Sequence, residues 1–205
     1  MPKEYGEDVH KYTNEHFWLA LKLVPRLAIR KKLALVEEFG LRNLFTYPPE
    51  RVDIALTVAQ FHALSYPDWP RINKTLAQTQ SMGAQVIGYS DDTYPKLLKE
   101  IYDPPLVLFT RGDVSLLNRP QMAIIGSRDV SYYGREIAHQ FAQELAESSL
   151  VITSGLALGV DANAHQGALK AVGKTIAVVA TGINEVYPRR HRELANNILR
   201  SGGLI

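Results

Sequence analysis

The residues of this sequence best suited to bind an anion are Gly126, Ser127 and Arg128. They directly follow the apolar run 122–125, which predicts a buried strand, and a helix is expected to begin near Tyr133. Glycine lets the backbone approach a ligand closely, and a helix N-terminus presents free N–H groups at the positive end of its dipole. An arginine guanidinium matches the oxygens of a phosphate. We therefore expect an anion-binding corner here.

Two further corners of similar composition follow along the chain. The second runs from Ser154 to Asp161 and contains two glycines, and the third begins at Thr181-Gly182 and continues into the basic stretch 187–192. Each corner taken alone is weak evidence, because many strand-to-helix turns contain glycine. The ordered set of three is a stronger indication of one shared site.

Asp161 and His165 are four residues apart and would share one face of a helix. Such spacing occurs in metal sites and in acid–base pairs. Two ligands are too few for a metal, so we favour a structural hydrogen bond that orients His165, with Asp161 capping the helix. His165 is kept as a candidate ligand contact.

Aromatic and basic side chains accompany the corners. Tyr132, Tyr133 and Tyr187 could stack on nucleic-acid bases or pack against the sheet, and both interpretations stay open. Lys174 stands at the start of a predicted strand and is equally open. In the first third of the chain, Arg26, Arg30, Lys31 and Lys32 predict a basic ridge, which is either an accessory surface or ordinary helix surface.

The elements that must position these corners alternate between strands and helices. Strands are expected at 84–89, 106–110, 122–125, 150–153 and 175–180, and helices at 133–148, 160–172 and 191–200. This alternation predicts a Rossmann-like α/β fold, with right-handed crossovers, a mostly parallel sheet and helices on both faces. In such sheets ligands bind beyond the carboxyl ends of the strands, so the three corners should line one cleft.

The preceding part of the chain has a helical pattern. Helices are expected at 16–24, 27–39, 52–64 and 72–82, with a short turn at 43–47. We therefore predict a small all-α domain over residues 1–82 and the Rossmann-like domain over 83–205. Residues 202–205 resemble the opening of another strand, which we interpret as a sign of truncation.

Composition limits the class of protein. The 205 residues include 23 basic and 21 acidic ones and no cysteine, for a net charge of +2. A polyanionic partner would therefore need a local basic cluster. We see neither a signal peptide nor an apolar run long enough to span a membrane, and expect a cytoplasmic protein with no cofactor and no metal.

Several motifs together resemble the DNA-processing protein A (DprA/Smf) family. They are Gly126-Ser-Arg128, Tyr133-Gly134, Ser154-Gly-Leu-Ala-Leu-Gly-Val-Asp-Ala162 with Ala164-His165, Gly173-Lys-Thr-Ile-Ala177, Thr181-Gly182, Tyr187-Pro188, and upstream Asp92-Thr-Tyr-Pro95 with Asp103-Pro-Pro105. The resemblance runs from about residue 15 to the end. It implies a helical domain of sterile-alpha-motif or helix-hairpin-helix type ahead of an extended Rossmann-like domain.

The resemblance also implies a function. Proteins of this family bind single-stranded DNA in natural transformation, protect the incoming strand and help to load the RecA recombinase, and they form homodimers through a segment that follows the last strand here. The expected contacts to DNA or phosphate are Gly126, Ser127, Arg128, Ser154, Gly155, Gly159, Asp161, His165, Lys174, Gly182, Arg189, Arg190 and Arg192. We expect binding that is independent of base sequence, without chemistry on the strand.

One departure and one alternative accompany this prediction. The hairpin stretch 23–30 contains no glycine, unlike the usual helix-hairpin-helix pattern, so we do not expect that hairpin to bind phosphate. The alternative is a nucleotide-binding or nucleotide-hydrolysing enzyme on a related fold. The sequence contains neither a dinucleotide-binding Gly-x-Gly-x-x-Gly pattern nor a Walker lysine loop, which weighs against it.

Overall fold

The computed structural model describes residues 11–47 and 55–205, which fold into two compact units. The first unit comprises the chain up to Ser81 together with Val86–Leu108. The second comprises Met82–Gln85 and Phe109–Ile205. The domain boundary expected after residue 82 remains a proposal.

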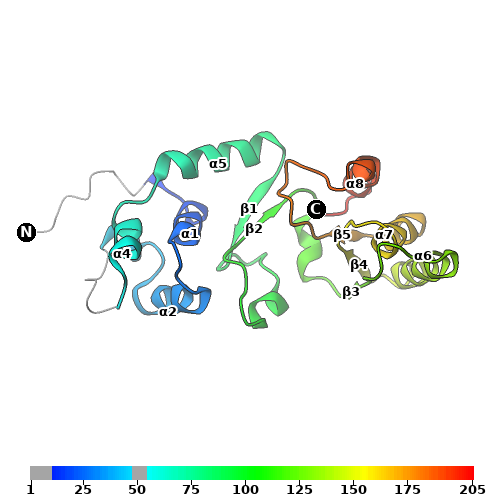
Figure 1. Ribbon diagram of the computed structural model, residues 1–205, viewed down its shortest axis with the longest axis horizontal. Helices are drawn as coiled ribbons and strands as arrows, with labels where there is room; N and C mark the ends of the chain where they lie inside the picture. Colours follow the sequence, from blue (N-terminus) through cyan, green and yellow to red (C-terminus); the bar gives the residue numbers. More distant parts are fainter. Residues whose placement is uncertain (1–10, 48–54) are drawn as a thin grey trace, which may run out of the picture. The chain divides into compact units, whose positions relative to one another are not determined.

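The first unit contains five α-helices within the described residues (Figure 1). They are α1 (Asn14–Leu23), α2 (Ile29–Phe39), α3 (Asn43–Thr46), α4 (Val58–Ser65) and α5 (Trp69–Ser81). Thr57 begins α4, because its hydroxyl accepts a bond from the Gln60 N–H at 3.3 Å. The helices expected at 16–24, 27–39 and 72–82 are confirmed. The expected helix at 52–64 starts later, and residues 52–54 lie outside the described residues.

Aromatic side chains form the core of this unit. The Tyr12 and Trp69 rings stack with centroids 4.0 Å apart, and Phe17 meets Trp69 edge to face. Trp18 is buried, and its indole N–H donates to the Ser90 hydroxyl at 3.0 Å. A Cβ on Gly88 would lie 2.2 Å from the Trp18 ring. This close approach packs Gly88, the last residue of β1 (Gln85–Gly88), on α1, and β1 pairs with β2 (Val107–Thr110) in a two-stranded sheet.

A parallel sheet organises the second unit. Its strands β3 (Gln121–Ala123), β4 (Val151–Ser154) and β5 (Thr175–Ala177) lie in that order, with Met122 opposite Ile152 and Ile152 opposite Thr175. Leu204 then pairs in parallel with Ile176 and in antiparallel fashion with Gly112. The parallel sheet that the sequence predicts is thus confirmed, and the segment around Leu204 continues it.

Three helices cover one face of this sheet (Figure 1). They are α6 (Tyr132–Glu147), α7 (Val160–Lys170) and α8 (Arg192–Arg200). Because side chains alternate along a strand, Ile152 packs with Ala142 and Ala164 on this face, whereas its neighbour Val151 points to the other side. There the short 3-10 helix η3 (Val114–Asn118) covers it through Leu116. Within residues 11–47 and 55–205, no helix is long and apolar enough to cross a bilayer.

Candidate functional site

The first two corners lie in direct backbone contact. Gly159 has φ +78°, and a Cβ there would lie 2.2 Å from the Ser127 carbonyl oxygen and 2.7 Å from that of Arg128. The Val160 N–H donates to the same Ser127 oxygen at 3.1 Å. Only glycine fits this position, since both the space and the backbone conformation exclude a side chain. The start of α7 is thereby fixed beside Arg128.

Hydrogen bonds join the carboxyl ends of the three strands. The Ser154 hydroxyl donates to the Ile124 carbonyl oxygen at 2.6 Å, which ties the end of β4 to that of β3. On the other side, the Val178 N–H donates to the Ser154 carbonyl oxygen at 2.8 Å. Ser154 is itself buried. Its side chain therefore positions the edge rather than a ligand.

The second corner presents unused backbone donors. In the part of the chain that the structure describes, the N–H groups of Gly155, Leu158 and Gly159 donate to no acceptor. The buried Asp161 carboxylate accepts from the Ala157 N–H at 3.2 Å. The predicted phosphate contact by Asp161 is thus revised, because its carboxylate braces the loop from within. The free N–H groups near the start of α7 are suited to an anion.

Arg128 is an exposed cation at the first corner of this edge. Its guanidinium donates to no acceptor within residues 11–47 and 55–205. The neighbouring Ser127 hydroxyl donates to the Asp129 carbonyl oxygen at 2.8 Å and accepts from the Asp129 N–H at 3.1 Å. Ser127 therefore shapes the turn, and the Arg128 guanidinium remains available to a ligand.

The third corner is attached to the second by a histidine. Gly182 takes φ +83°, and the chain then passes through the 3-10 helix η4 (Arg189–His191). The His191 ring donates from Nδ1 to the Leu156 carbonyl oxygen at 2.8 Å. Sequence reasoning missed this role, because a bond between residues 35 positions apart leaves no local pattern. The exposed residues Arg189, Arg190 and Arg192 surround this attachment.

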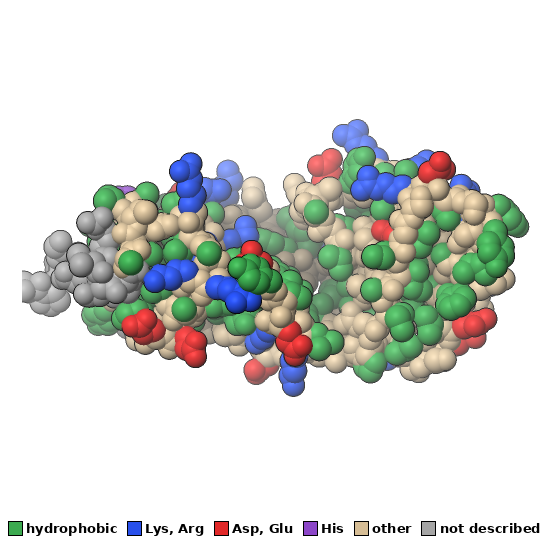
Figure 2. Space-filling view, turned by 60° about the horizontal axis from the view of Figure 1, so that its bottom comes forward, with side chains coloured by type: hydrophobic (Ala, Val, Ile, Leu, Met, Phe, Trp, Pro, Cys, Tyr) green, Lys and Arg blue, Asp and Glu red, His purple; other side chains and the backbone are tan. Residues whose placement is uncertain are grey.

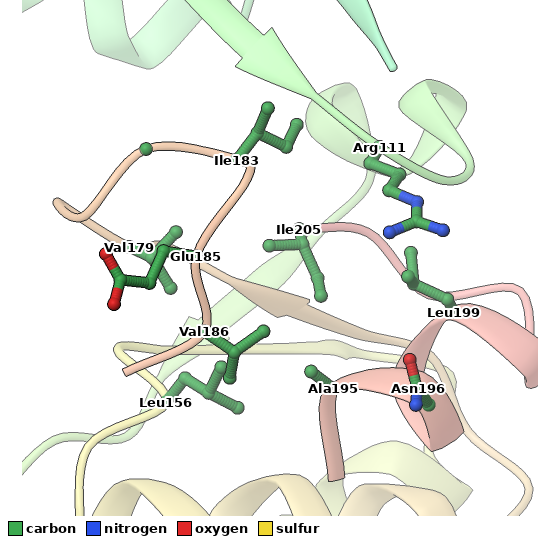
Figure 3. Close-up of a pocket in the computed structure, with 11 residues that line it drawn as sticks. Arg111, Leu156, Val179, Ile183, Glu185, Val186, Ala195, Asn196, Leu199 and Ile205 are labelled. Carbon is green, nitrogen blue, oxygen red and sulfur yellow. The ribbon is translucent and has the colours of Figure 1, made fainter. Parts of the chain in front are cut away.

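A small pocket adjoins the third corner (Figure 3). Apolar side chains of the loop, such as Val179 and Val186, face Ile205 and the side chains of α8. Its volume of about 30 Å³ holds one or two water molecules. This pocket is too small to enclose a nucleotide.

His165 lies inside the unit and not at the edge. It is fully buried, and Nδ1 lies 2.7 Å from the Thr175 hydroxyl, which donates its own proton to the Ile152 carbonyl oxygen. The imidazole must therefore donate from Nδ1. Burial, together with the positive potential of His191, lowers the pKa of His165 to about 4. The structural hydrogen bond expected for His165 is present, but its burial is incompatible with contact to DNA.

Lys174 also lies away from the three corners. It directly precedes β5, at the amino ends of the parallel strands, and its ammonium donates to the Ser201 carbonyl oxygen at 2.6 Å. We therefore leave Lys174 out of the site, as we do His165.

The predicted tyrosines and all but one residue of the predicted basic ridge are exposed to solvent. Tyr132, Tyr133 and Tyr187 are exposed, so their rings are not packed into the core. In the first unit, Arg26, Arg30 and Lys31 are exposed, but Lys32 is buried and donates to the Lys22 carbonyl oxygen at 3.0 Å. Burial and the charge of Lys22 lower the pKa of Lys32 to about 8. The predicted ridge thus excludes Lys32.

Residues 85–205 match the family described as DNA recombination-mediator protein A. The chain is 38% identical over 133 residues to the DNA processing protein DprA of Bacillus subtilis strain 168, covering 64% of this chain and 45% of that protein. It is 37% identical over 152 residues to protein Smf of Escherichia coli K12, covering 73% of this chain and 40% of that protein. The chain thus spans less than half the length of these two relatives.

Solved structures extend the similarity to the fold. The crystal structure of DNA processing protein A from Streptococcus pneumoniae matches with a TM-score of 0.73 and 32% identity, over 95% of this chain and 66% of that one. DNA processing protein A from Helicobacter pylori, whose structure describes a single-stranded DNA binding mode, matches with a TM-score of 0.52 and 32% identity. That match covers 59% of this chain and 54% of the other. By its sequence and its fold, the chain belongs to the DNA recombination-mediator protein A family.

Proposed function

We propose that this protein binds single-stranded DNA, independently of base sequence, along the carboxyl ends of β3, β4 and β5. One observation carries the proposal: Gly159 packs on the carbonyl groups of Ser127 and Arg128, which fixes the start of α7 beside Arg128. Arg128 supplies a charge-assisted contact to phosphate and the unused N–H groups of the second corner supply neutral ones. Neither group distinguishes one base from another.

The surroundings of the two corners support a strand rather than a small anion. Arg189, Arg190 and Arg192 add exposed positive charge around the third corner, where they can follow a phosphate backbone. Tyr132 and Tyr133 begin α6, directly after the first corner, and expose their rings. Stacking of a base on an aromatic ring contributes about 1–3 kcal/mol and tolerates any base.

The likeness to the family supports a proposal for the biological role. In this proposal the protein takes part in natural transformation in the cytoplasm, protects the incoming single strand and helps to load the RecA recombinase. In the same proposal the protein acts as a homodimer, and no reaction takes place on the DNA. Bacillus subtilis DprA and the Streptococcus pneumoniae structure support this placement through their likeness to the chain.

A nucleotide-processing enzyme has less support. The pocket at the third corner holds about 30 Å³, and the Asp161 carboxylate and His165 ring are buried and engaged with the loop and the sheet. A thermal-shift screen separates the two functions: we expect oligonucleotides, and not mononucleotides at equal phosphate concentration, to raise the melting temperature. The reverse order would favour the enzyme.

The direct test is Arg128→Ala in the full chain. Hydrogen bonds to charged groups contribute about 1.5–3 kcal/mol, so the affinity for oligo-dT should fall about ten- to hundredfold. The log–log slope of affinity against salt should also become shallower by about 0.7, the value for one phosphate on a single strand. Both quantities are measured by fluorescence anisotropy over a salt series.

Arg200→Ala is the matched control. Arg200 is exposed at the end of α8, and because α8 runs opposite to the strands it lies toward their amino ends. Its removal should leave affinity and salt slope unchanged. Equal binding by the Arg128 variant and the native chain, with equal melting temperatures, would contradict the proposal.

A further inference from the structure

The first unit carries an exposed tyrosine stacked on an arginine. The Arg30 guanidinium lies 4.1 Å from the centre of the Tyr102 ring, and its Nε donates to the Tyr102 carbonyl oxygen at 3.2 Å. Tyr102 nevertheless remains 72% exposed. One face of the ring is therefore covered by a flat cation, and the other is open to solvent.

The loop that presents Tyr102 is held at two points. Arg30 donates a hydrogen bond to the carbonyl oxygen of Tyr102 itself. Pro105, three residues after Tyr102, accepts a hydrogen bond from the buried Tyr94 hydroxyl at 2.7 Å through its carbonyl oxygen. A ring held in advance loses little conformational freedom when a ligand stacks on it. This feature distinguishes Tyr102 from a mobile surface tyrosine.

The surroundings of the ring combine apolar surface with mixed charge. Leu97 and Ile101 are exposed on the same short segment. Lysine and arginine side chains lie beside exposed hydrophobic ones on the part of this unit that Figure 2 shows. The charged residues of segment 96–103, together with the one next to Arg30, are Lys31, Lys96, Lys99, Glu100 and Asp103. Arg30, Lys96 and Lys99 already have interaction partners within the protein, so stacking on the free face of Tyr102 is the main contact that this segment offers to nucleic acid.

We propose that Tyr102, backed by Arg30, is a second contact for single-stranded DNA, on which one base stacks. The inference rests on the proposed function of the strand-end edge and extends it to the first unit. An aromatic ring with one free face and a cation beside it can stack on an unpaired base, whatever the base sequence of the DNA. A protein partner docking on Leu97, Ile101 and Tyr102 is the competing outcome of the test.

Tyr102→Ala in the full chain tests this contact. With a 30-nucleotide oligo-dT, the affinity should fall about tenfold, while the salt slope should stay that of the native chain because no phosphate contact is lost. Tyr102→Phe keeps the ring and should bind like the native chain. Tyr47→Ala is the matched control, since Tyr47 lies in the same unit and is 73% exposed, and it should have no effect.

The outcomes distinguish this inference from the proposed function. If Tyr102→Ala binds normally while Arg128→Ala is weakened, the second contact is overturned and the strand-end site stands. Equal losses in Tyr102→Ala and Tyr47→Ala would also overturn it. If the native chain itself binds no single-stranded DNA, the proposed function fails, and this inference fails with it.

Discussion

The two ends of the parallel sheet in the second unit each carry a basic residue next to a strand, but the two residues are used differently. At the carboxyl ends, Arg128 is exposed and donates to no acceptor in the described chain. At the amino ends, the Lys174 ammonium donates to the Ser201 carbonyl oxygen at 2.6 Å. A cation that already satisfies a carbonyl group gains little from a phosphate, whereas an unpaired one gains a full contact.

Glycines account for the difference between the ends. At the carboxyl ends, Gly159 packs directly on the backbone carbonyl groups of Ser127 and Arg128. Gly126 packs closely on the side chain of Val160, and Gly155 on that of Asp161. The polar groups left over are N–H donors and the Arg128 guanidinium, which all suit an anion. At the amino ends, a Cβ on Gly202 would lie 2.8 Å from the half-buried Lys174 ammonium, so the same closeness serves to hold a cation that is already paired.

The largest loss of stability is expected from placing a side chain at Gly159, where the first two corners are in contact. Gly159→Ala forces a methyl group onto the Ser127 carbonyl oxygen in a backbone conformation that essentially only glycine adopts. The free energy of unfolding should fall by about 3 kcal/mol or more, as judged from backbone strain plus overpacking. Urea denaturation measures the change.

Gly83→Ala is the control that separates backbone strain from the steric clash expected in Gly159→Ala. Gly83 has φ +65°, yet a Cβ there would meet no atom within 4 Å. Its substitution should therefore cost only about 1–2 kcal/mol, the penalty of a left-handed conformation. If both variants lost the same stability, the backbone contact at Gly159 would not be what distinguishes the carboxyl ends.

A second expectation concerns His165, which belongs to neither end. Its pKa is lowered to about 4 in the fold, so as the pH falls below about 6.5 the unfolded chain takes up a proton that the folded chain does not. Stability is full above this range and should fall by up to about 3 kcal/mol as the pH decreases toward 4. Thermal unfolding between pH 7 and 4.5 follows the loss.

His165→Gln provides the comparison for this pH dependence. The variant is less stable at pH 7, but its stability should decline less steeply with acid than that of the native chain. Parallel pH profiles for the two proteins would mean that His165 is not held neutral by burial.

The smallest effect on stability and DNA affinity is expected from substituting Lys174, whose ammonium is already hydrogen-bonded. Lys174→Met removes the bond to Ser201 and should lower stability by about 1 kcal/mol. Affinity for single-stranded DNA should change less than twofold, in contrast to Arg128→Ala. A loss equal to that of Arg128→Ala would return Lys174 to the site and remove the distinction between the two ends.

The sequence was sufficient to predict most of the elements and the glycine corners, although α4 begins later than expected and β5 ends at Ala177 rather than at residue 180. Apolar runs and helical periodicity placed α6 and α8 within a residue or two of their observed limits. Because parallel strands share one carboxyl edge, the order of the elements also predicted that the three corners would line one cleft, and the first two corners are in direct contact. The same logic, applied to Lys174, would have placed it at the opposite end, since it precedes its strand.

Hydrogen-bond partners were beyond the reach of sequence patterns. The spacing of Asp161 and His165 drew attention to a shared helix face, but Asp161 binds the preceding loop and His165 binds Thr175 on a strand. The buried state of Lys32 within a basic ridge is a similar case. Partners of this kind are set by tertiary packing, which local periodicity does not encode.

The packing of Trp18 on Gly88 has a practical consequence for dividing this protein. A fragment that stopped at residue 82 would lack the strand that packs on the Trp18 indole, and the indole N–H would lose its acceptor, the Ser90 hydroxyl. Solubility and cooperative melting should therefore survive in a fragment carried on to residue 108, and suffer in the shorter one.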